Sequence, residues 1–134
     1  MSGLELVNVS KSYQSHTIVE DVSLSIREGE FAVFVGPSGC GKSTLLRLIA
    51  GLDPVSEGQI SIDGRDVSRA AAGSRSVAMV FQSYALYPHM SVFENMAFGL
   101  RMAKLSEDEI KRRVAEAARI LQIEPLLERK PRAL

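Results

Sequence analysis

The sequence predicts an α/β fold, because a glycine-rich loop joins a continuously apolar segment to a segment with helical spacing. Residues 31–35 are apolar and rich in aromatic and β-branched side chains, as expected of a parallel strand covered on both faces. In residues 42–50 the leucines, isoleucine and alanine recur at helical spacing, and Gly51 suits the end of that helix. We therefore expect a buried strand, a loop and a helix in that order.

Two further β regions flank this unit. Apolar and polar residues alternate in residues 4–9 and 22–26, which predicts half-exposed antiparallel strands. Ile60 and Ile62 lead into Asp63-Gly64, a strong hairpin-turn pair, and residues 77–81 predict a second buried strand. These elements predict an antiparallel β-subdomain at the N-terminus beside an α/β core.

The last third of the chain predicts helices. Ser91 and Ser106 each precede a glutamate by three residues, the spacing of a capping box at a helix start. In the second helix five apolar residues share one face: Ile110, Val114, Ala117, Ala118 and Leu121. We expect the start of an α-helical subdomain here.

Composition limits the classes of function. The 134 residues are enough for one domain, and 16 basic side chains balance 16 acidic ones, so no broad positive field would attract nucleic acid. Apolar runs are far shorter than the roughly 18 residues of a membrane span, so membrane contact would need a partner. One cysteine and no leader-like N-terminus favour a reducing, cytoplasmic location.

The letters GPSGCGKS at residues 36–43 match the phosphate-binding pattern G-x-x-x-x-G-K-[ST], placed between the predicted strand and helix. Glycines let backbone N–H groups face phosphates, the lysine adds a charge, and the serine hydroxyl is a Mg²⁺ ligand. The alternative is a glycine-rich turn with a structural role only. The predicted nucleotide-binding residues are Gly36, Ser38, Gly39, Cys40, Gly41, Lys42, Ser43 and Thr44.

The cysteine and the two histidines do not predict a further catalytic or metal site. Cys40 occupies a free position of the pattern, so a catalytic thiol is not expected. His16 and His89 lack companions at metal-ligand spacing, so no metal site beyond nucleotide-bound Mg²⁺ is expected.

Several motifs together make the sequence resemble the ATPase subunits of ATP-binding-cassette (ABC) transporters along all 134 residues. Besides the phosphate loop they are Lys11-Ser12-Tyr13, the strand-like residues 77–81 followed by Gln82, and residues 84–95, which are most similar to sugar importers of the maltose or glycerol-phosphate type. The resemblance implies a P-loop NTPase (RecA-like) core.

The resemblance also implies roles for two residues outside the loop. Tyr13 would stack on adenine, and the alternative is an ordinary core or surface tyrosine. Gln82 would reach Mg²⁺ and the attacking water, and the alternative is a plain loop residue. The implied cofactors are ATP and Mg²⁺, with Lys42 and Gln82 as catalytic residues and Ser43 and Gln82 at the metal.

Partners follow from the same resemblance. Residues 84–95 would form part of a groove for a cytoplasmic helix of transmembrane permease subunits, although ordinary packing is the alternative for residues such as Leu86 and Tyr87. A second ATPase subunit, identical or different, would complete the pair on the cytoplasmic face of the inner membrane. The expected layout is a β-subdomain and core in residues 1–82 and the glutamine loop with helices in residues 83–134.

Residues 132–134 resemble the approach to the family's Leu-Ser-Gly-Gly-Gln signature, and no apolar strand ending in Asp-Glu or switch histidine is recognised; Asp63 is a turn residue, not the metal aspartate. We expect an N-terminal part of the ATPase that binds ATP without hydrolysing it. Two alternatives stay open: an inert or non-catalytic gene fragment, and a soluble cassette ATPase that serves translation or DNA repair.

Overall fold

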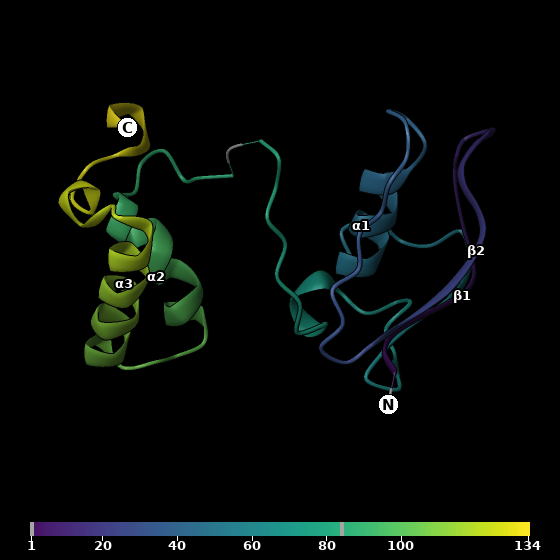
Figure 1. Ribbon diagram of the computed structural model, residues 1–134, viewed down its shortest axis with the longest axis horizontal. Helices are drawn as coiled ribbons and strands as arrows, with labels where there is room; N and C mark the ends of the chain where they lie inside the picture. Colours follow the sequence, from purple (N-terminus) through teal and green to yellow (C-terminus); the bar gives the residue numbers. More distant parts are fainter. Residues whose placement is uncertain (1, 84) are drawn as a thin grey trace. The chain divides into compact units, whose positions relative to one another are not determined.

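The computed structural model describes residues 2–83 and 85–134 and divides the chain into two compact units, Met1–Val80 and Phe81–Leu134 (Figure 1). Each unit has its own core and is described by itself. Tyr84, the first residue of the segment that resembles sugar importers, lies outside the described residues. None of the helices in the described ranges is long and apolar enough to cross a bilayer.

The first unit contains one antiparallel sheet with the order β2-β1-β3-β4. Its strands are β1 (Ser2–Tyr13), β2 (His16–Arg27), β3 (Glu57–Ile62) and β4 (Arg65–Asp66). Strand β1 pairs with β2 on one side and with β3 on the other, and Asp63-Gly64 forms the turn between β3 and β4. The antiparallel strands and the hairpin turn predicted from the sequence are confirmed.

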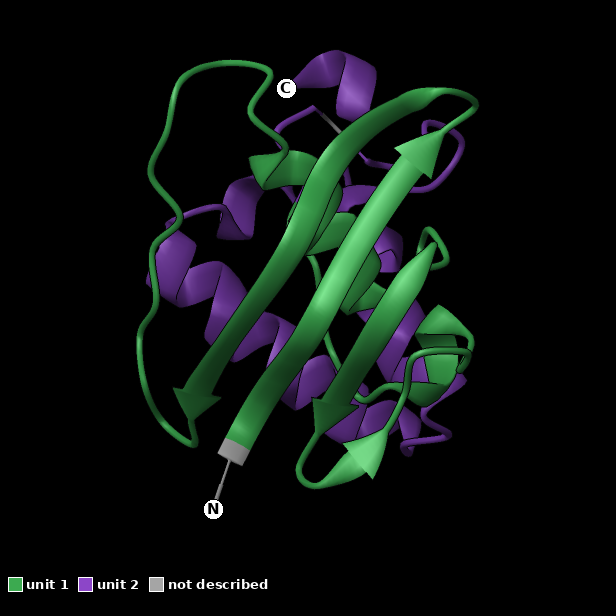
Figure 2. Ribbon diagram, turned by 90° about the vertical axis from the view of Figure 1, so that its right-hand side faces the viewer, with its two compact units in different colours: residues 1–80 green, residues 81–134 purple. Residues whose placement is uncertain are grey.

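Helix α1 (Lys42–Ala50) lies across one face of this sheet (Figure 2). Its leucines at 45 and 48 are buried, and Gly51 ends the helix with φ 79°, as predicted. Full burial of one leucine contributes about 1.5–3 kcal/mol to the hydrophobic term. The core of this unit consists of Leu6, Val9, Val19, Leu45, Leu48, Ile60 and Val67.

The two buried parallel strands predicted at residues 31–35 and 77–81 are wrong for the structure. Neither segment belongs to a strand, and Phe31, Val35 and Val80 are 90%, 89% and 97% exposed. A strand is stabilised by ladder hydrogen bonds to a neighbour and by layers on its faces. Within the described residues neither segment pairs with a strand of the sheet, so apolar composition alone does not make a strand.

The second unit contains α2 (Val92–Met102) and α3 (Glu107–Leu121), which lie side by side in Figure 1. The Ser91 capping box is confirmed: Glu94 N–H donates to Ser91 Oγ at 3.1 Å, and Ser91 N–H donates to Glu94 Oε2 at 2.7 Å. Two short 3₁₀ helices follow α3 in this unit, η2 (Glu124–Leu126) and η3 (Pro131–Ala133). Another, η1 (Ala72–Ser74), lies in the first unit.

The core of the second unit lies between these two helices, around Ala97, Ile110 and Val114. The predicted face of α3 is correct at its centre, where Ala118 is also buried, but wrong at Leu121, which is 62% exposed. Leu121 is the last residue of α3, and the chain turns at Gln122 with φ 57°. The buried stripe therefore ends one turn earlier than the sequence pattern does.

The second predicted capping box, at Ser106 and Glu109, is only half formed, and the contacts that replace it lower the pKa of Glu109. Ser106 Oγ accepts a hydrogen bond from Glu109 N–H, but the Glu109 carboxylate accepts from Arg112 and Arg113 instead of from the Ser106 backbone. These two guanidinium groups lower the pKa of Glu109 to about 2.

We expect Glu109 to titrate near pH 2 rather than near 4.5. A depressed carboxyl pKa stabilises the folded state above the unfolded pKa, and that contribution disappears as the pH falls from about 4.5 to about 2. Carboxyl-carbon NMR shifts over this range would measure the Glu109 midpoint. A Glu109 midpoint unchanged by Arg112→Ala plus Arg113→Ala would contradict the assigned cause.

Candidate nucleotide-binding site

The predicted phosphate loop is a compact turn that leads directly into α1. Gly39 and Gly41 have φ values of 80° and 94°, and the first helical hydrogen bond runs from Leu45 N–H to Gly41 C=O at 2.9 Å. The amides of the first turn have no acceptor inside the helix, and the helix dipole places partial positive charge there. The local geometry therefore offers backbone donors to an anion.

Gly41 fixes the loop against strand β2. A Cβ atom at this position would lie 2.8 Å from Ile18 O and 3.3 Å from a methyl of Val19, in addition to the cost of its positive φ. Because the neighbour is strand backbone, it cannot rotate away. Only glycine permits this close approach, so the sheet itself positions the loop.

The Lys42 side chain folds back over the loop. Its Nζ donates to Gly36 O and to Pro37 O, the latter at 2.8 Å, and lies 3.7 Å from the Cys40 sulfur. All three partners are uncharged loop atoms. The ammonium group is thus held where the loop curves, with its positive charge available to an anion.

Ser43 and Thr44 follow Lys42 in the first turn of α1. Ser43 is exposed at the first turn of α1, and Thr44 beside it is half-buried. A pocket of about 480 Å³ lies beside the loop, walled by residues 40–42, by β2 and by residues 33–35. Free backbone amides, a lysine and an exposed hydroxyl are the groups that hold a nucleotide phosphate and its Mg²⁺ in loops of this pattern, so the residues present fit both.

Tyr13 lies at the end of β1, outside the loop, in a cluster of polar contacts. Its hydroxyl donates to Asp53 Oδ2 at 2.9 Å, and Arg47 Nε donates to the same oxygen at 2.9 Å. Hydrogen bonding to the carboxylate raises the pKa of Tyr13, while Arg47 first and Tyr13 second lower the pKa of Asp53. Lys11 Nζ lies 4.8 Å from the centroid of the Tyr13 ring.

Sequence reasoning missed Lys11, Arg47 and Asp53 as neighbours of Tyr13. One signal existed for Lys11, which precedes Tyr13 by two residues and so shares its face of the strand. Asp53 is 40 residues away in sequence, and no local pattern connects it to Tyr13.

Gln82 is not brought to the loop by any described contact. It is exposed and lies in the second unit, whereas the loop and Tyr13 lie in the first. The structure therefore places the predicted residues 36–44 in one loop and the first turn of α1, and Tyr13 in a separate cluster of the same unit. The binding roles of these residues and of Gln82 stay predictions.

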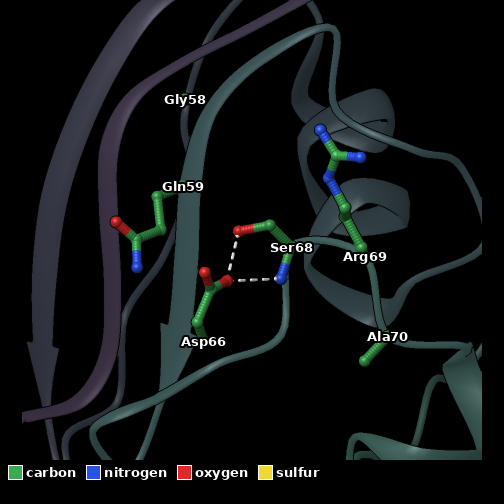
Figure 3. A pocket seen from close by; sticks show the side chains of 6 residues that line it. All are labelled: Gly58, Gln59, Asp66, Ser68, Arg69 and Ala70. Carbon is green, nitrogen blue, oxygen red and sulfur yellow. Dashed lines mark hydrogen bonds between the residues drawn. The ribbon is translucent and has the colours of Figure 1, made fainter.

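Two more pockets lie away from the loop. One of about 390 Å³ adjoins the β3–β4 hairpin, where Ser68 N–H and Oγ both donate to Asp66 Oδ1 at 2.9 and 2.6 Å. Figure 3 shows the Arg69 side chain pointing away from this carboxylate. The other, about 450 Å³ in the second unit, has Pro88, His89, Lys130, Arg132 and Ala133 in its walls.

Comparison with known proteins decides the family. The family model described as "ABC transporter" matches residues 19–134 of this chain. The chain belongs to the ABC transporter family. The predicted resemblance is confirmed.

Curated members of the ABC transporter family are similar over the whole chain. The alpha-glucoside transport ATP-binding protein AglK of Rhizobium meliloti is 56% identical over 134 residues, which is 100% of this chain and 37% of AglK. The sn-glycerol-3-phosphate import ATP-binding protein UgpC of Ruegeria pomeroyi is 57% identical over 100% of this chain and 38% of its own length. The chain spans little more than a third of the relatives it matches.

A solved ABC protein confirms the fold class. The ATP-binding cassette MJ0796, in a dimeric post-hydrolysis state bound to ADP and Pi, matches with a TM-score of 0.88 and 30% identity. The match covers 98% of this chain and 62% of that chain. The fold is therefore that of a P-loop NTPase with an antiparallel β-subdomain and part of a helical subdomain, here shorter than in its relatives.

Proposed function

We propose that this ABC transporter chain is the ATP-binding part of an importer, which couples MgATP to the uptake of a solute, most plainly a sugar. The observation that carries the proposal is the loop at residues 36–44, with glycines at positive φ and Lys42 over its curve, in a chain that is 56% identical over its full length to an alpha-glucoside transport ATP-binding protein.

The binding half of the activity rests on this chain's own residues. Backbone amides of Gly39, Gly41 and the first turn of α1 would contact the β- and γ-phosphates, and Lys42 would exchange its loop carbonyls for phosphate oxygens. Ser43 would provide a hydroxyl to Mg²⁺, which would neutralise phosphate charge when bound. Tyr13 would stack on the base, and Gln82 would reach the metal and the attacking water.

The partner half rests on the second unit. Around residues 85–95, Leu86 and Tyr87 are 45% and 44% exposed, and Tyr87 packs on Phe98 with ring centroids 5.0 Å apart. An exposed apolar and aromatic surface beside helices suits a docked helix of a transmembrane permease subunit. A second ATPase subunit would complete the pair; the similar cassette MJ0796 is a dimer in its post-hydrolysis state bound to ADP and Pi. The chain would then act at the cytoplasmic face of the membrane without crossing it.

The solute class is proposed from relatives named for alpha-glucoside transport, glycerol-3-phosphate import and lactose transport. A second candidate is polyamine uptake, because the spermidine/putrescine import protein PotA of Aggregatibacter actinomycetemcomitans is 54% identical over 98% of this chain. The gene would be expressed in cells that lack the matching uptake ATPase, and uptake of labelled maltose, glycerol-3-phosphate and spermidine would be measured. Restored uptake of one solute would distinguish sugar or glycerol-phosphate import from polyamine import.

For residues 1–134 by themselves we propose nucleotide binding without repeated hydrolysis, since the family's signature, Asp-Glu strand end and switch histidine are not recognised among them. The purified 134-residue polypeptide is expected to bind ATP in Mg²⁺ buffer and to release no phosphate beyond the level of Lys42→Ala. Multiple turnovers that disappear in Lys42→Ala would contradict this proposal.

The transport role has its own test. The neutral charge balance, with 16 basic and 16 acidic residues, argues against a ribosome- or DNA-associated ATPase. The full gene product is expected to co-purify with a polytopic membrane subunit. Stable association with ribosomes or DNA instead would overturn the transport assignment.

A further inference from the structure

We propose that Asp53 is a positioning residue for the base-stacking tyrosine: with Arg47 it anchors the Tyr13 hydroxyl, while Lys11 covers one face of the ring and leaves the other face for adenine. This inference rests on the proposed role of Tyr13 in stacking. It adds Asp53, Arg47 and Lys11 to the part of the site that would bind the base.

The hydroxyl of Tyr13 is fixed at a carboxylate that is itself fixed. Asp53 Oδ2 accepts from the Tyr13 hydroxyl and from Arg47 Nε, each at 2.9 Å, and its other oxygen lies 3.4 Å from the same guanidinium group. The Asp53 side chain is only 20% exposed, so water competes weakly for it. A ring held at its tip loses little further freedom when a base stacks on it, which favours binding through pre-organisation.

The faces of the ring are not equivalent. Lys11 is 7% exposed; its Nζ donates to Pro54 O at 2.6 Å and lies 4.8 Å from the ring centroid. An ammonium group at that distance is attracted to the ring face and occupies it. Tyr13 is nevertheless 45% exposed, so ring surface is still available to a ligand.

Helix α1 connects the phosphate-binding residues to Arg47, the partner of Asp53. Arg47 lies in the last turn of α1, and Lys42 and Ser43 lie in the first turn of the same helix. A rigid helix that carries the phosphate-binding residues at its start and the guanidinium anchor near its end sets the spacing between the phosphate contacts and the tyrosine. Asp53 transmits that spacing to the ring.

The test measures the affinity of the full gene product for two probes by calorimetry in Mg²⁺ buffer. One probe is ATP, which has a base, and the other is inorganic tripolyphosphate, which does not. Tyr13→Phe keeps the ring but removes its hydrogen bond, and Asp53→Asn removes the charged acceptor. Each is expected to weaken ATP binding roughly 3-fold, the size of one net hydrogen bond, with tripolyphosphate binding unchanged. The double variant is expected to lose no more than either single variant, because both remove one contact.

A matched control is Asp66→Asn, which alters another hydrogen-bonded aspartate of the same unit and should leave both affinities unchanged. A structural defect would weaken both probes, so a change restricted to ATP identifies positioning of the base. Additive losses in the double variant, or tighter ATP binding by Asp53→Asn, would overturn the inference.

Tyr13→Ala distinguishes this inference from the function on which it rests. If stacking occurs, ATP affinity should fall by roughly 5-fold or more, with tripolyphosphate unaffected. No change would refute the proposed role of Tyr13 itself. A loss in Tyr13→Ala without a loss in Tyr13→Phe would keep stacking and refute only the positioning by Asp53.

Discussion

Lys42→Ala is expected to lower the affinity for MgATP roughly 100-fold, the largest effect of any single substitution in the site. A hydrogen bond to a charged group contributes about 1.5–3 kcal/mol, and about 1.4 kcal/mol corresponds to one factor of ten. The carbonyls of Gly36 and Pro37 that lose their donor lie on an exposed loop, so water replaces the ammonium group. Calorimetric titration with ATP would measure the loss.

Two variants make this result specific. Lys42→Arg keeps the charge but replaces a compact ammonium group by a planar guanidinium that fits the tight loop poorly, so recovery should be partial at most. Lys111→Ala removes an exposed lysine from α3 and should leave binding unchanged. Equal ATP affinity in the parent chain and Lys42→Ala would show that the loop does not bind phosphate.

Arg75→Met is expected to lower the free energy of unfolding by about 2–4 kcal/mol, because each buried acceptor left without a donor costs about 1–3 kcal/mol. Arg75 is 4% exposed and donates to Leu48 O at 2.8 Å, to Ile49 O at 3.2 Å and to Ala70 O at 3.0 Å. Leu48 O also accepts from Gly51 N–H at 3.2 Å, so Ile49 O at the end of α1 and Ala70 O are the acceptors that the substitution leaves without a described donor.

Urea unfolding followed by circular dichroism would measure this effect, with Arg69→Met as the control. Arg69 is exposed and only six residues away, and surface substitutions usually change stability by less than about 0.5 kcal/mol. Arg75→Lys should be intermediate, since one ammonium group reaches fewer carbonyls than a guanidinium fork. Equal stability of Arg75→Met and Arg69→Met would refute the capping role.

Gly51 shows why this arginine fits. A Cβ at Gly51 would lie 2.5 Å from Arg75 Nε, so the left-handed glycine that ends α1 also makes room for the side chain that satisfies the helix carbonyls. The sequence predicted Gly51 as a helix end from local pattern. It did not reveal Arg75, because an arginine beside glycine and serine is typical of an exposed turn and its partners are as much as 27 residues away.

The features predicted correctly are those whose physics is local. The Ser91 capping box, the Asp63-Gly64 turn and the glycine turn that leads into α1 depend on residues within a few positions of one another, and all three are present in the structure. Residues 31–35 and 77–81 have the right composition for strands, but a strand also needs neighbours that residues far along the chain must provide. Tyr13 lies at the end of β1, and its contact with Asp53, 40 residues away, depends on the tertiary fold.

Glu109 illustrates competition between two local rules. A glutamate three residues after a serine predicts a reciprocal capping box, yet arginines three and four residues further on also face it on the helix. In the structure the Glu109 carboxylate accepts hydrogen bonds from both arginines. The sequence contained both signals but not their relative strength.

Because Lys42 Nζ already bonds carbonyls of its own loop, nucleotide binding would exchange these hydrogen bonds for bonds to phosphate. Two of the three ammonium donors already bond neutral carbonyls, so an anion that takes more than one donor would leave these carbonyls to water. A weakly basic monovalent anion gains little from that trade, whereas a polyphosphate that also accepts the amides of the first turn gains several charge-assisted bonds at once. The resting loop would therefore favour a triphosphate over chloride.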